Sequence, residues 1–453
     1  MNSQSESTTV EAVADTVRPP QGDYWDYLVI AAIFASILAL AYAALATSLL
    51  QPLVDIARRQ HWSMLWVRPT VIWITMGLAL LFLRTILWLL YRPFAAVRAE
   101  EAPPLTVIIP AYNEGAMVEH AIASVAAASY PRGRLQILAV DDGSTDDTWR
   151  YIQNAALRHP GLVTPIRLPA NLGKRGALAE GFRRASGEII VTVDSDSVIE
   201  RGALLSIAGP FRDRRIGAVA GKVAVHNRRA GLIPRMLHVR FILSFDYLRG
   251  AQSVFRTVYC CPGALAAYRT SVVRQVLPAW ERQTFLGAPC TYGEDRALTN
   301  DILARGYDTV YQRSAVVHTL VPETYAKLCR MFLRWDRSYI REEFRFARIV
   351  WRRPLLPRLL AVYESTITNL RYPVAYASMA LWAVNSLSDP ASLVRMLLAI
   401  MVVSFVYVLY YLRSERSWDF VFGILYAYFS FFALTWIFPY AALTVRARGW
   451  LTR

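Results

Sequence analysis

The stretch Glu188-Ile-Ile-Val-Thr-Val-Asp194-Ser-Asp196 decides the fold class of this chain. Its apolar run, residues 189–193, predicts a strand buried within a parallel sheet. Asp194 and Asp196 follow at once, and in open α/β sheets ligands bind beyond the carboxyl ends of the strands. Two carboxylates one residue apart suit Mg²⁺ or Mn²⁺ that bridges to a diphosphate. The stretch therefore predicts a metal site at Asp194 and Asp196, on the carboxyl edge of an α/β sheet.

The composition indicates a basic membrane protein. Of the 453 residues, 55% are hydrophobic, which is more than soluble globular domains usually carry. The formal net charge is +16, and basic membrane proteins keep Lys and Arg mainly on the cytoplasmic side. The competing interpretation, a nucleic-acid-binding protein, is disfavoured because the basic residues are scattered and no recognition motif is present.

The four cysteines include no Cys-x-x-Cys pair, so we expect reduced, buried thiols.

The N-terminal region is predicted to cross the membrane twice. Residues 1–22 are polar and are expected to form a disordered tail. Residues 23–92 contain two apolar stretches, 24–50 and 66–90, and each is long enough to cross a bilayer.

Residues 93–320 predict a cytosolic α/β domain with a mostly parallel sheet. Short apolar strands alternate with helical patterns there, as they do in parallel α/β folds. The expected strands are residues 105–109, 135–140, 164–168, 189–193, 217–225 and 309–312.

The region after this domain is predicted to return to the membrane. Residues 321–357 are helical and basic with a large polar face, which predicts amphipathic helices at the membrane interface; an ordinary solvated helix is the alternative. The C-terminal transmembrane region, 358–453, holds apolar stretches at 358–386, 392–412 and 418–445. The last one contains Pro439, and a full crossing would leave three arginines outside, so we expect a broken or re-entrant element there. The prediction is four crossings with both termini cytosolic.

Two other expected strands also end in polar side chains. The first ends in Ala111-Tyr112-Asn113-Glu114 and the second in Val140-Asp141-Asp142-Gly143. A carboxylate at such a position can accept hydrogen bonds from ribose hydroxyls or from a base N–H. The loop Asn171-Leu-Gly-Lys174-Arg175-Gly176 opens a helix, and a helix N-terminus beside Lys174 favours phosphate oxygens. These residues together predict a nucleotide-binding site.

These motifs resemble those of family 2 glycosyltransferases, which have the nucleotide-sugar-binding fold called GT-A. The segment Phe285-Leu-Gly-Ala-Pro-Cys290-Thr-Tyr-Gly293-Glu294-Asp295-Arg296-Ala-Leu-Thr-Asn300 is similar to the acceptor-site segment of hyaluronan synthases and of rhizobial chitin-oligosaccharide synthases. Arg334-Trp335 resembles the membrane-proximal Arg-Trp motif of the processive members. The resemblance runs from about Val107 to Glu342 and carries several motifs in the right order.

The resemblance implies a role for each matching position. The implied roles are uridine contacts for Asp142, Tyr112 and Glu114; nucleotide or phosphate contacts for Lys174; metal binding for Asp194 and Asp196; general base for Asp295; diphosphate binding for Arg334; and closure of the active site for Trp335. Arg175 and Arg296, beside these residues, are also taken as substrate-binding, as is Asp194. The chemistry asks for the same parts, since inverting transfer needs a base for the acceptor hydroxyl and positive charge on the leaving diphosphate. Glu294 is expected to be a structural partner of Arg296.

The resemblance implies an inner-membrane, processive, inverting β-glycosyltransferase of the hexosyltransferase class. It would polymerise UDP-N-acetylglucosamine, with or without UDP-glucuronate, with Mg²⁺ or Mn²⁺ as cofactor. The acceptor would be the growing glycan, which the enzyme would pass outward. Membrane lipids would surround the protein. A chitin-oligosaccharide synthase-like N-acetylglucosaminyltransferase is the leading alternative. A non-processive transferase acting on a lipid phosphate and a catalytically silent glycan-binding or export partner are the others.

Three departures from the hyaluronan synthase pattern leave the polymer open. Met331 stands where Gln is usual, and Pro262-Gly263 stands where those enzymes usually have Ser-Gly-Pro. The chain ends Gly449-Trp450-Leu451-Thr452-Arg453, with Leu451 in place of Gly.

Overall fold

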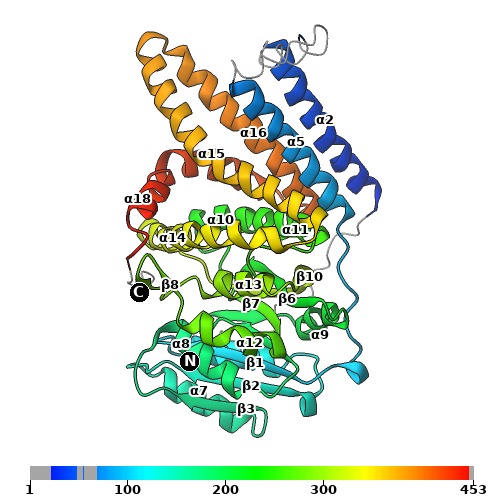
Figure 1. The fold of residues 1–453 in the computed structure, drawn as a ribbon, viewed down its shortest axis with the longest axis vertical. Coiled ribbons are helices and arrows are strands. Elements are labelled where there is room, and N and C mark those ends of the chain that lie inside the picture. The colour runs from blue at the N-terminus through cyan, green and yellow to red at the C-terminus, as the bar shows by residue number, and fades with distance from the viewer. Residues whose placement is uncertain (1–21, 48–54, 56–68, 448–453) are drawn as a thin grey trace, which may run out of the picture.

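The computed structural model describes residues 22–47, 55 and 69–447, and it stacks three layers (Figure 1). An α/β domain lies at one end, a layer of helices that includes α10 (Leu232–Ile242) and α14 (Tyr325–Ile349) covers it, and long helices extend from the far side of that layer. The predicted disordered tail, apart from residue 22, and the chain end from Trp450 to Arg453 lie outside the described residues.

Eight strands form the central sheet in the order β3-β2-β1-β4-β7-β6-β10-β5. Their bounds are β1 Leu105–Ala111, β2 Leu135–Asp141, β3 Val163–Arg167, β4 Ile189–Val193, β5 Ser197–Ile199, β6 Ile216–Val225, β7 Leu265–Arg269 and β10 Asp308–Thr319. All six strands predicted from the sequence are present, so the α/β fold with a mostly parallel sheet is confirmed. The prediction missed β7, which pairs antiparallel with both β4 and β6, and the three-residue β5, which pairs antiparallel with β10.

The strands of the sheet are buried on both sides because helices cover both of its faces. Val107 and Ile109 of β1 point into one core, and Ile108 between them points into the other, as the two-residue period of a strand requires. The first core is closed by α6 (Met117–Ala126), α9 (Ala203–Ala208), α10 and α14. The second core is closed by α8 (Gly173–Arg184), α12 (Thr270–Glu281) and α13 (Glu294–Ala304). Helix α7 (Thr148–Arg158) packs on α6 and on the edge strand β3.

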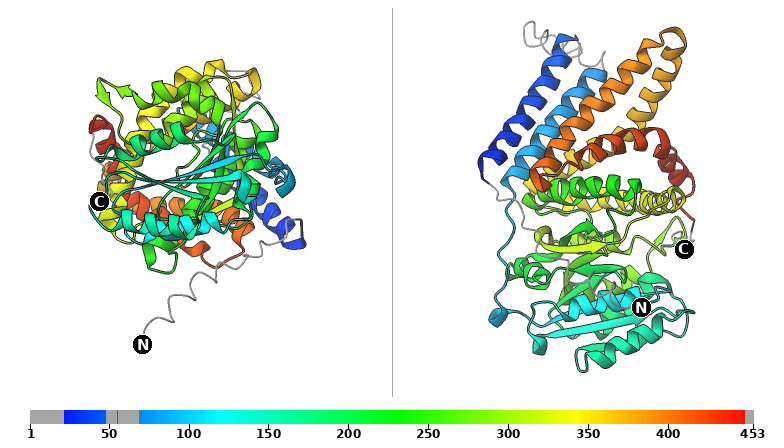
Figure 2. Two further views of the ribbon diagram at one scale, coloured as in Figure 1. Left: turned by 90° about the horizontal axis from the view of Figure 1, so that it is seen from below. Right: turned by 180° about the vertical axis from the view of Figure 1, so that it is seen from behind.

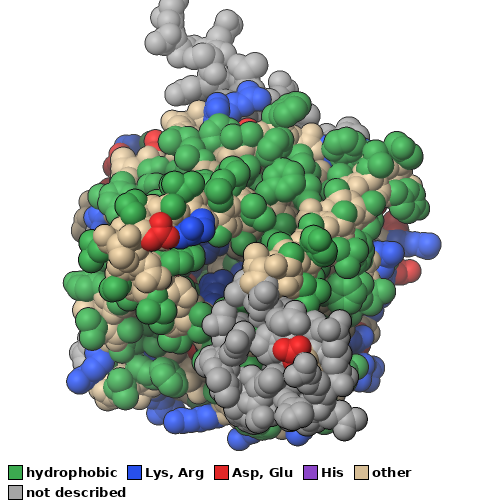
Figure 3. All heavy atoms as spheres, turned by 90° about the horizontal axis from the view of Figure 1, so that it is seen from above, with side chains coloured by type: hydrophobic (Ala, Val, Ile, Leu, Met, Phe, Trp, Pro, Cys, Tyr) green, Lys and Arg blue, Asp and Glu red, His purple; other side chains and the backbone are tan. Residues whose placement is uncertain are grey.

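Three described helices are long and apolar enough to cross a membrane: α2 (Tyr24–Ala46), α5 (residues 71–90 of Pro69–Leu90) and α16 (Ala391–Glu415). They match three of the four predicted crossings, and hydrophobic side chains dominate the described face at this end of the molecule (Figure 3). The fourth, α15 (Leu355–Ser388), has 34 residues and lies beside α16, but it is too polar to be counted with them. Its crossing therefore stays a prediction.

The C-terminal stretch is bent. Helix α17 (Phe420–Phe429) continues through a π-helical segment, η6 (Ser430–Leu434), and α18 (Ile437–Leu443) follows after a 44° bend. Helix α17 packs on α10 and α18 packs on α14, so the segment curves back toward the α/β domain (Figure 2, right). A hydrogen bond from the Tyr292 hydroxyl to the Ala447 carbonyl, 2.7 Å long, fixes its end there. This shape agrees with the broken or re-entrant element predicted from Pro439 and the arginines.

The interface region contains one 25-residue helix, α14, whose polar face is largely buried. Arg337, Arg341 and Glu342 are buried, and Glu342 accepts hydrogen bonds from Gln283 and Asn300 of the α/β domain. This helix therefore does not present its polar face to solvent, and its position at a membrane interface stays a prediction. The sequence pattern identified a polar face correctly, but that face is turned toward charged groups of the protein.

Candidate active site

The loops that follow β1 and β2 are braced against each other at the carboxyl edge of the sheet. The backbone N–H of Asn113 donates to Ser144 Oγ at 3.0 Å, and the Asn113 side chain accepts from the Thr145 N–H at 2.9 Å. The backbone N–H of Glu114 donates to Thr148 Oγ1 at 2.8 Å. These bonds place Tyr112 and Glu114 beside the end of β2, as the sequence predicted.

Asp142 lies buried between the ends of β2 and α8. Its Oδ1 accepts from the Leu172 N–H at 2.8 Å, and burial raises the pKa of this carboxyl to about 6. Gly143 next to it has a φ of +70°, and a Cβ there would lie 2.7 Å from the Ala170 carbonyl carbon. Only glycine fits this approach, which brings Asp142 to the start of the helix that carries Lys174.

Lys174 joins the Asp-x-Asp motif to the start of α13. Its Nζ lies 2.5 Å from Asp194 Oδ1 and 3.4 Å from Glu294 Oε1. Burial alone would lower the pKa of this amine, but the two carboxylates outweigh it and raise the pKa. The expected partnership of Glu294 with Arg296 is wrong, because Glu294 faces Lys174 and Arg296 pairs with Glu343 at 2.6 Å.

Asp196 lies beside Asp194 and accepts hydrogen bonds from two hydroxyl groups. It accepts from Ser197 Oγ at 3.2 Å and Thr319 Oγ1 at 3.3 Å. Burial, and then the charges of Asp194 and Glu114, raise its pKa to about 6, so a divalent cation would relieve this repulsion. Among the described residues, no three or more His, Cys, Asp or Glu side chains lie close enough together to hold a metal ion. The remaining ligands would have to come from substrate phosphates and water, which is usual for Mg²⁺.

Asp295, the predicted base, lies in the first turn of α13. Its Oδ1 accepts from the Arg296 N–H at 2.7 Å, and its Oδ2 faces the Gly263 N–H at 3.4 Å and Cys260 Sγ at 3.6 Å. Burial and the neighbouring Glu294 raise the pKa of Asp295. A raised pKa makes a carboxylate a better proton acceptor near neutral pH.

Gly263 lies between the Asp-x-Asp motif and Asp295. A Cβ on Gly263 would lie 2.9 Å from Lys174 Nζ and 3.4 Å from Asp194 Oδ1, while its N–H faces Asp295. The loop of residues 259–263, which we call the acceptor loop, therefore connects Asp194 with Asp295. The quoted motifs do not indicate this spacing, because it depends on the antiparallel β7 that follows the loop.

Arg334 and Trp335 are neighbouring residues of α14. Burial and Glu294 raise the pKa of Asp295, and the positive charge of Arg334 opposes part of that rise. Trp335 is half-buried, with its ring 6.2 Å from that of Phe241 and 5.6 Å from that of Phe332.

Two predicted substrate-binding arginines are held by protein groups. Arg175 is buried with its guanidinium 4.8 Å from the Trp280 ring centroid, and it donates to the Trp280 carbonyl. Arg296 lies 4.6 Å from the Tyr339 ring in addition to its ion pair with Glu343. Both side chains therefore connect elements around the site.

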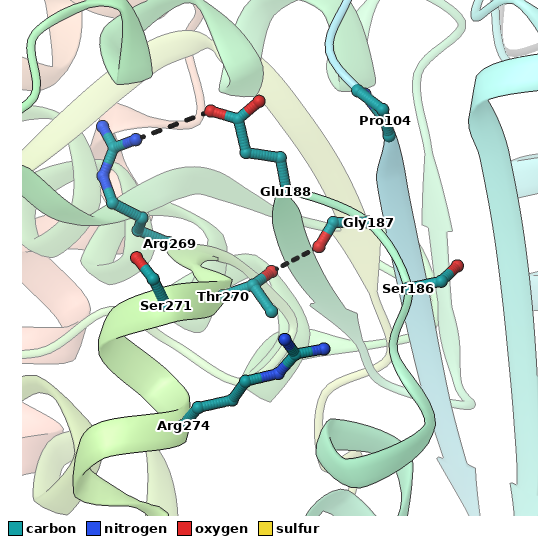
Figure 4. A pocket seen from close by; sticks show the side chains of 8 residues that line it. All are labelled: Pro104, Ser186, Gly187, Glu188, Arg269, Thr270, Ser271 and Arg274. Carbon is teal, nitrogen blue, oxygen red and sulfur yellow. Dashed lines mark hydrogen bonds and ion pairs between the residues drawn. The ribbon is translucent and has the colours of Figure 1, made fainter.

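A cavity of about 370 Å³ lies at the opposite edge of the sheet, where β1 and β4 begin (Figure 4). Arg269 in its wall is 3.7 Å from Glu188 and donates to the Phe211 carbonyl, and Thr270 donates to the Gly187 carbonyl. None of the predicted site residues lines this cavity.

Comparison with known proteins agrees with this geometry. The family model described as glycosyl transferase family 2 matches residues 106–277. An N-acetylglucosaminyltransferase of Azorhizobium caulinodans is 32% identical over 78% of this chain and 87% of its own, and a hyaluronan synthase of Streptococcus pyogenes is 30% identical over 80% and 86%. A mannosyltransferase of Pyrobaculum calidifontis, solved with GDP-Man and Mn²⁺, shares the fold with a TM-score of 0.57 at 22% identity, over 80% of this chain and 98% of its own.

The chain belongs to glycosyltransferase family 2. It is a glycosyltransferase with a GT-A-type domain and helices able to span a membrane.

Proposed function

We propose that this enzyme is a processive, inverting β-glycosyltransferase that polymerises UDP-N-acetylglucosamine, with or without UDP-glucuronate. The observation that carries the proposal is the acceptor loop, which puts the metal-binding carboxylate Asp194 and the base Asp295 on either side of Gly263. A diphosphate held at Asp194 and an acceptor hydroxyl held at Asp295 would then lie on opposite sides of one donor sugar. The rhizobial and streptococcal relatives support the choice of sugar.

On this proposal, each residue performs one task in the transfer. Asp142, with Tyr112 and Glu114, binds the uridine, and Lys174 exchanges its contact with Asp194 for the donor phosphates. Asp194 and Asp196 would hold Mg²⁺ or Mn²⁺, which when bound would neutralise the diphosphate.

Asp295 Oδ2 takes the acceptor hydroxyl proton as that oxygen attacks the anomeric carbon from the face opposite the diphosphate. Arg334 stabilises the charge that develops on the leaving diphosphate.

Polar side chains above Trp335 support export of the product. Asp336 is half-buried and burial raises its pKa to about 6, the Tyr339 hydroxyl donates to Asn369 Oδ1 at 2.8 Å, and Arg371 donates to the Tyr372 hydroxyl at 3.2 Å. Ionisable groups among membrane helices are costly and often line the path of a substrate. A glycan leaving the base would meet them on its way between α14 and α15.

We place the enzyme in the plasma membrane with residues 93–357 in the cytosol, where UDP-sugars are made. On this proposal α2, α5, α15 and α16 cross the membrane, and α17 with α18 stays on the cytosolic side. This arrangement puts both termini in the cytosol.

A chitin-oligosaccharide synthase-like activity is the second candidate. Its support is the rhizobial N-acetylglucosaminyltransferases among the relatives and Pro262-Gly263 in the acceptor loop, which departs from the hyaluronan synthase pattern.

Purified enzyme supplied with labelled UDP-N-acetylglucosamine, alone and with UDP-glucuronate, tests both candidates. Product that needs both donors and is cut by hyaluronidase supports the first version, and product from one donor that is cut by chitinase supports the second. Chelator should abolish synthesis and Mn²⁺ or Mg²⁺ should restore it. A single sugar added to a lipid phosphate would refute processive synthesis, and no UDP release from either donor would refute the proposed donors.

A further inference from the structure

An ion pair between two predicted membrane helices lies next to the acceptor loop. Arg84 of α5 donates to Glu364 Oε1 of α15 through Nη2 at 2.9 Å and Nε at 3.2 Å. Glu364 is buried, and Nη2 of Arg84 also donates to Thr368 Oγ1 at 2.8 Å. A buried ion pair contributes little net stability, because desolvation offsets the attraction. Charged residues within membrane helices more often mark a functional contact.

Glu364 also accepts hydrogen bonds from two elements of the α/β domain. The Gln252 amide of α11 (Arg249–Val254) donates to Oε1 at 3.2 Å, and the Tyr259 hydroxyl lies 3.4 Å from Oε2. The Tyr259 ring packs edge-on to Phe346 of α14 at 4.8 Å. One carboxylate therefore joins α5, α15 and the first residue of the acceptor loop.

The acceptor loop leads directly from Tyr259 to the base. Cys260, the next residue, places its Sγ 3.6 Å from Asp295 Oδ2, and its carbonyl accepts from Arg249 Nε at 3.0 Å. Three residues further on, the Gly263 N–H faces the same Oδ2. A shift of Tyr259 would therefore move both groups that hold the reactive oxygen of Asp295.

We propose that Glu364 is a positioning residue: through Tyr259 it fixes the acceptor loop against Asp295, so that membrane helices α5 and α15 set where the acceptor hydroxyl meets the base. The inference rests on the proposed role of Asp295 as the base. Neither Arg84 nor Glu364 contacts the Asp-x-Asp motif in this arrangement, so donor binding should not depend on them.

Tyr259→Phe removes the hydroxyl, which lies 3.4 Å from Glu364 Oε2 and 3.3 Å from the Ala361 carbonyl of α15, and it leaves no charge unpaired; the double variant described below tests the share of Glu364. Its matched control is Tyr363→Phe, because the Tyr363 hydroxyl joins the same two helices by donating to the Met76 carbonyl at 2.8 Å without touching the loop. We measure how donor turnover divides between glycosyl transfer and hydrolysis of UDP-N-acetylglucosamine by water. We expect the transfer-to-hydrolysis ratio of Tyr259→Phe to fall roughly tenfold at unchanged donor KM, which is the size of one hydrogen bond to a charged group. Tyr363→Phe should behave as wild type.

Thiol reactivity gives a readout that needs no activity. Cys260 is half-buried and the other three cysteines are buried, so the maleimide labelling rate of Cys260 reports how firmly the loop is held. We expect labelling to become roughly tenfold faster in Tyr259→Phe and in the double variant Arg84→Leu/Glu364→Leu. Cys260→Ser is the control, because the part of the labelling that it removes is the part that comes from Cys260.

Two results would overturn the inference. The first is that Tyr259→Phe has the same transfer-to-hydrolysis ratio and the same Cys260 labelling rate as an active wild-type enzyme. The second is that Arg84→Leu/Glu364→Leu binds UDP normally and its Cys260 is labelled at the wild-type rate. A wild type that hydrolyses and transfers nothing from UDP-N-acetylglucosamine would instead refute the proposed function, and the labelling rates would still decide whether Glu364 holds the loop.

Discussion

Replacing Gly293 by alanine tests how closely α13 must pack on α14 for this enzyme to work. Gly293 has a φ of +75° and directly precedes Glu294 and Asp295. A Cβ there would lie 1.9 Å from Ser338 Oγ, 2.6 Å from Ser338 Cβ and 2.8 Å from Arg341 Nη2. Rotation of the Ser338 side chain relieves the first contact, but the backbone of α14 fixes its Cβ.

The size of the effect follows from these distances. An ordinary contact needs about 3.4 Å, so the two helices would have to separate by roughly 0.8 Å, the difference between 3.4 and 2.6 Å. A displacement of about 1 Å at a reacting group costs about 10²-fold in rate. The left-handed backbone adds about 1–2 kcal/mol of strain for a residue with a side chain. We therefore expect Gly293→Ala to lose transfer about 10²-fold, because Asp295 moves away from Arg334.

Gly306 is the matched control at the other end of α13. It has a φ of +85° and nothing within 4 Å of an added Cβ, so Gly306→Ala carries the strain without the clash. UDP release and thermal unfolding of the purified enzyme should show a similar loss of stability from strain in both variants, but a loss of rate only in Gly293→Ala. Adding Ser338→Gly to Gly293→Ala should recover most of the rate. The reasoning is refuted if Gly293→Ala keeps more than half of the wild-type rate, or if Gly306→Ala is equally slow.

Three further outcomes are expected at the site. Asp295→Asn should keep UDP binding but slow transfer by about 10²- to 10⁴-fold, because it removes the base and little volume; wild-type turnover would contradict the assignment. UDP affinity, measured by calorimetry, should fall as the pH drops below about 6, because the buried Asp142 carboxylate then gains a proton and stops accepting from the uracil; Asp142→Asn should reduce this pH dependence without abolishing it, since Asp196 also has a pKa of about 6, and an unchanged profile would count against the role. Trp335→Ala should shorten the polymer on a gel more than it weakens UDP binding, whereas full-length product at a normal rate would leave Trp335 as a packing residue beside Phe241.

Much of the fold and part of the site follow from local patterns in the sequence. The run of residues 189–193 could be recognised as a buried strand because its length and composition suffice, and Asp194 and Asp196 then had to lie at the carboxyl edge. Strand β7 was missed because Leu265–Arg269 is short and rich in alanine, and its antiparallel direction depends on which neighbours it meets.

The sequence by itself determined most of the elements, the two ends with membrane-spanning character and the chemical types of the site residues. Each of these depends on neighbours a few positions away, through the period of apolar side chains or a motif at the end of a strand. Only the tertiary structure decided which groups meet. Lys174 reaches Glu294 and Tyr259 reaches Glu364 over more than 100 positions, and no local pattern specifies such pairs. They exist because strand order and helix packing bring distant segments to one place, where burial makes each polar group require a partner.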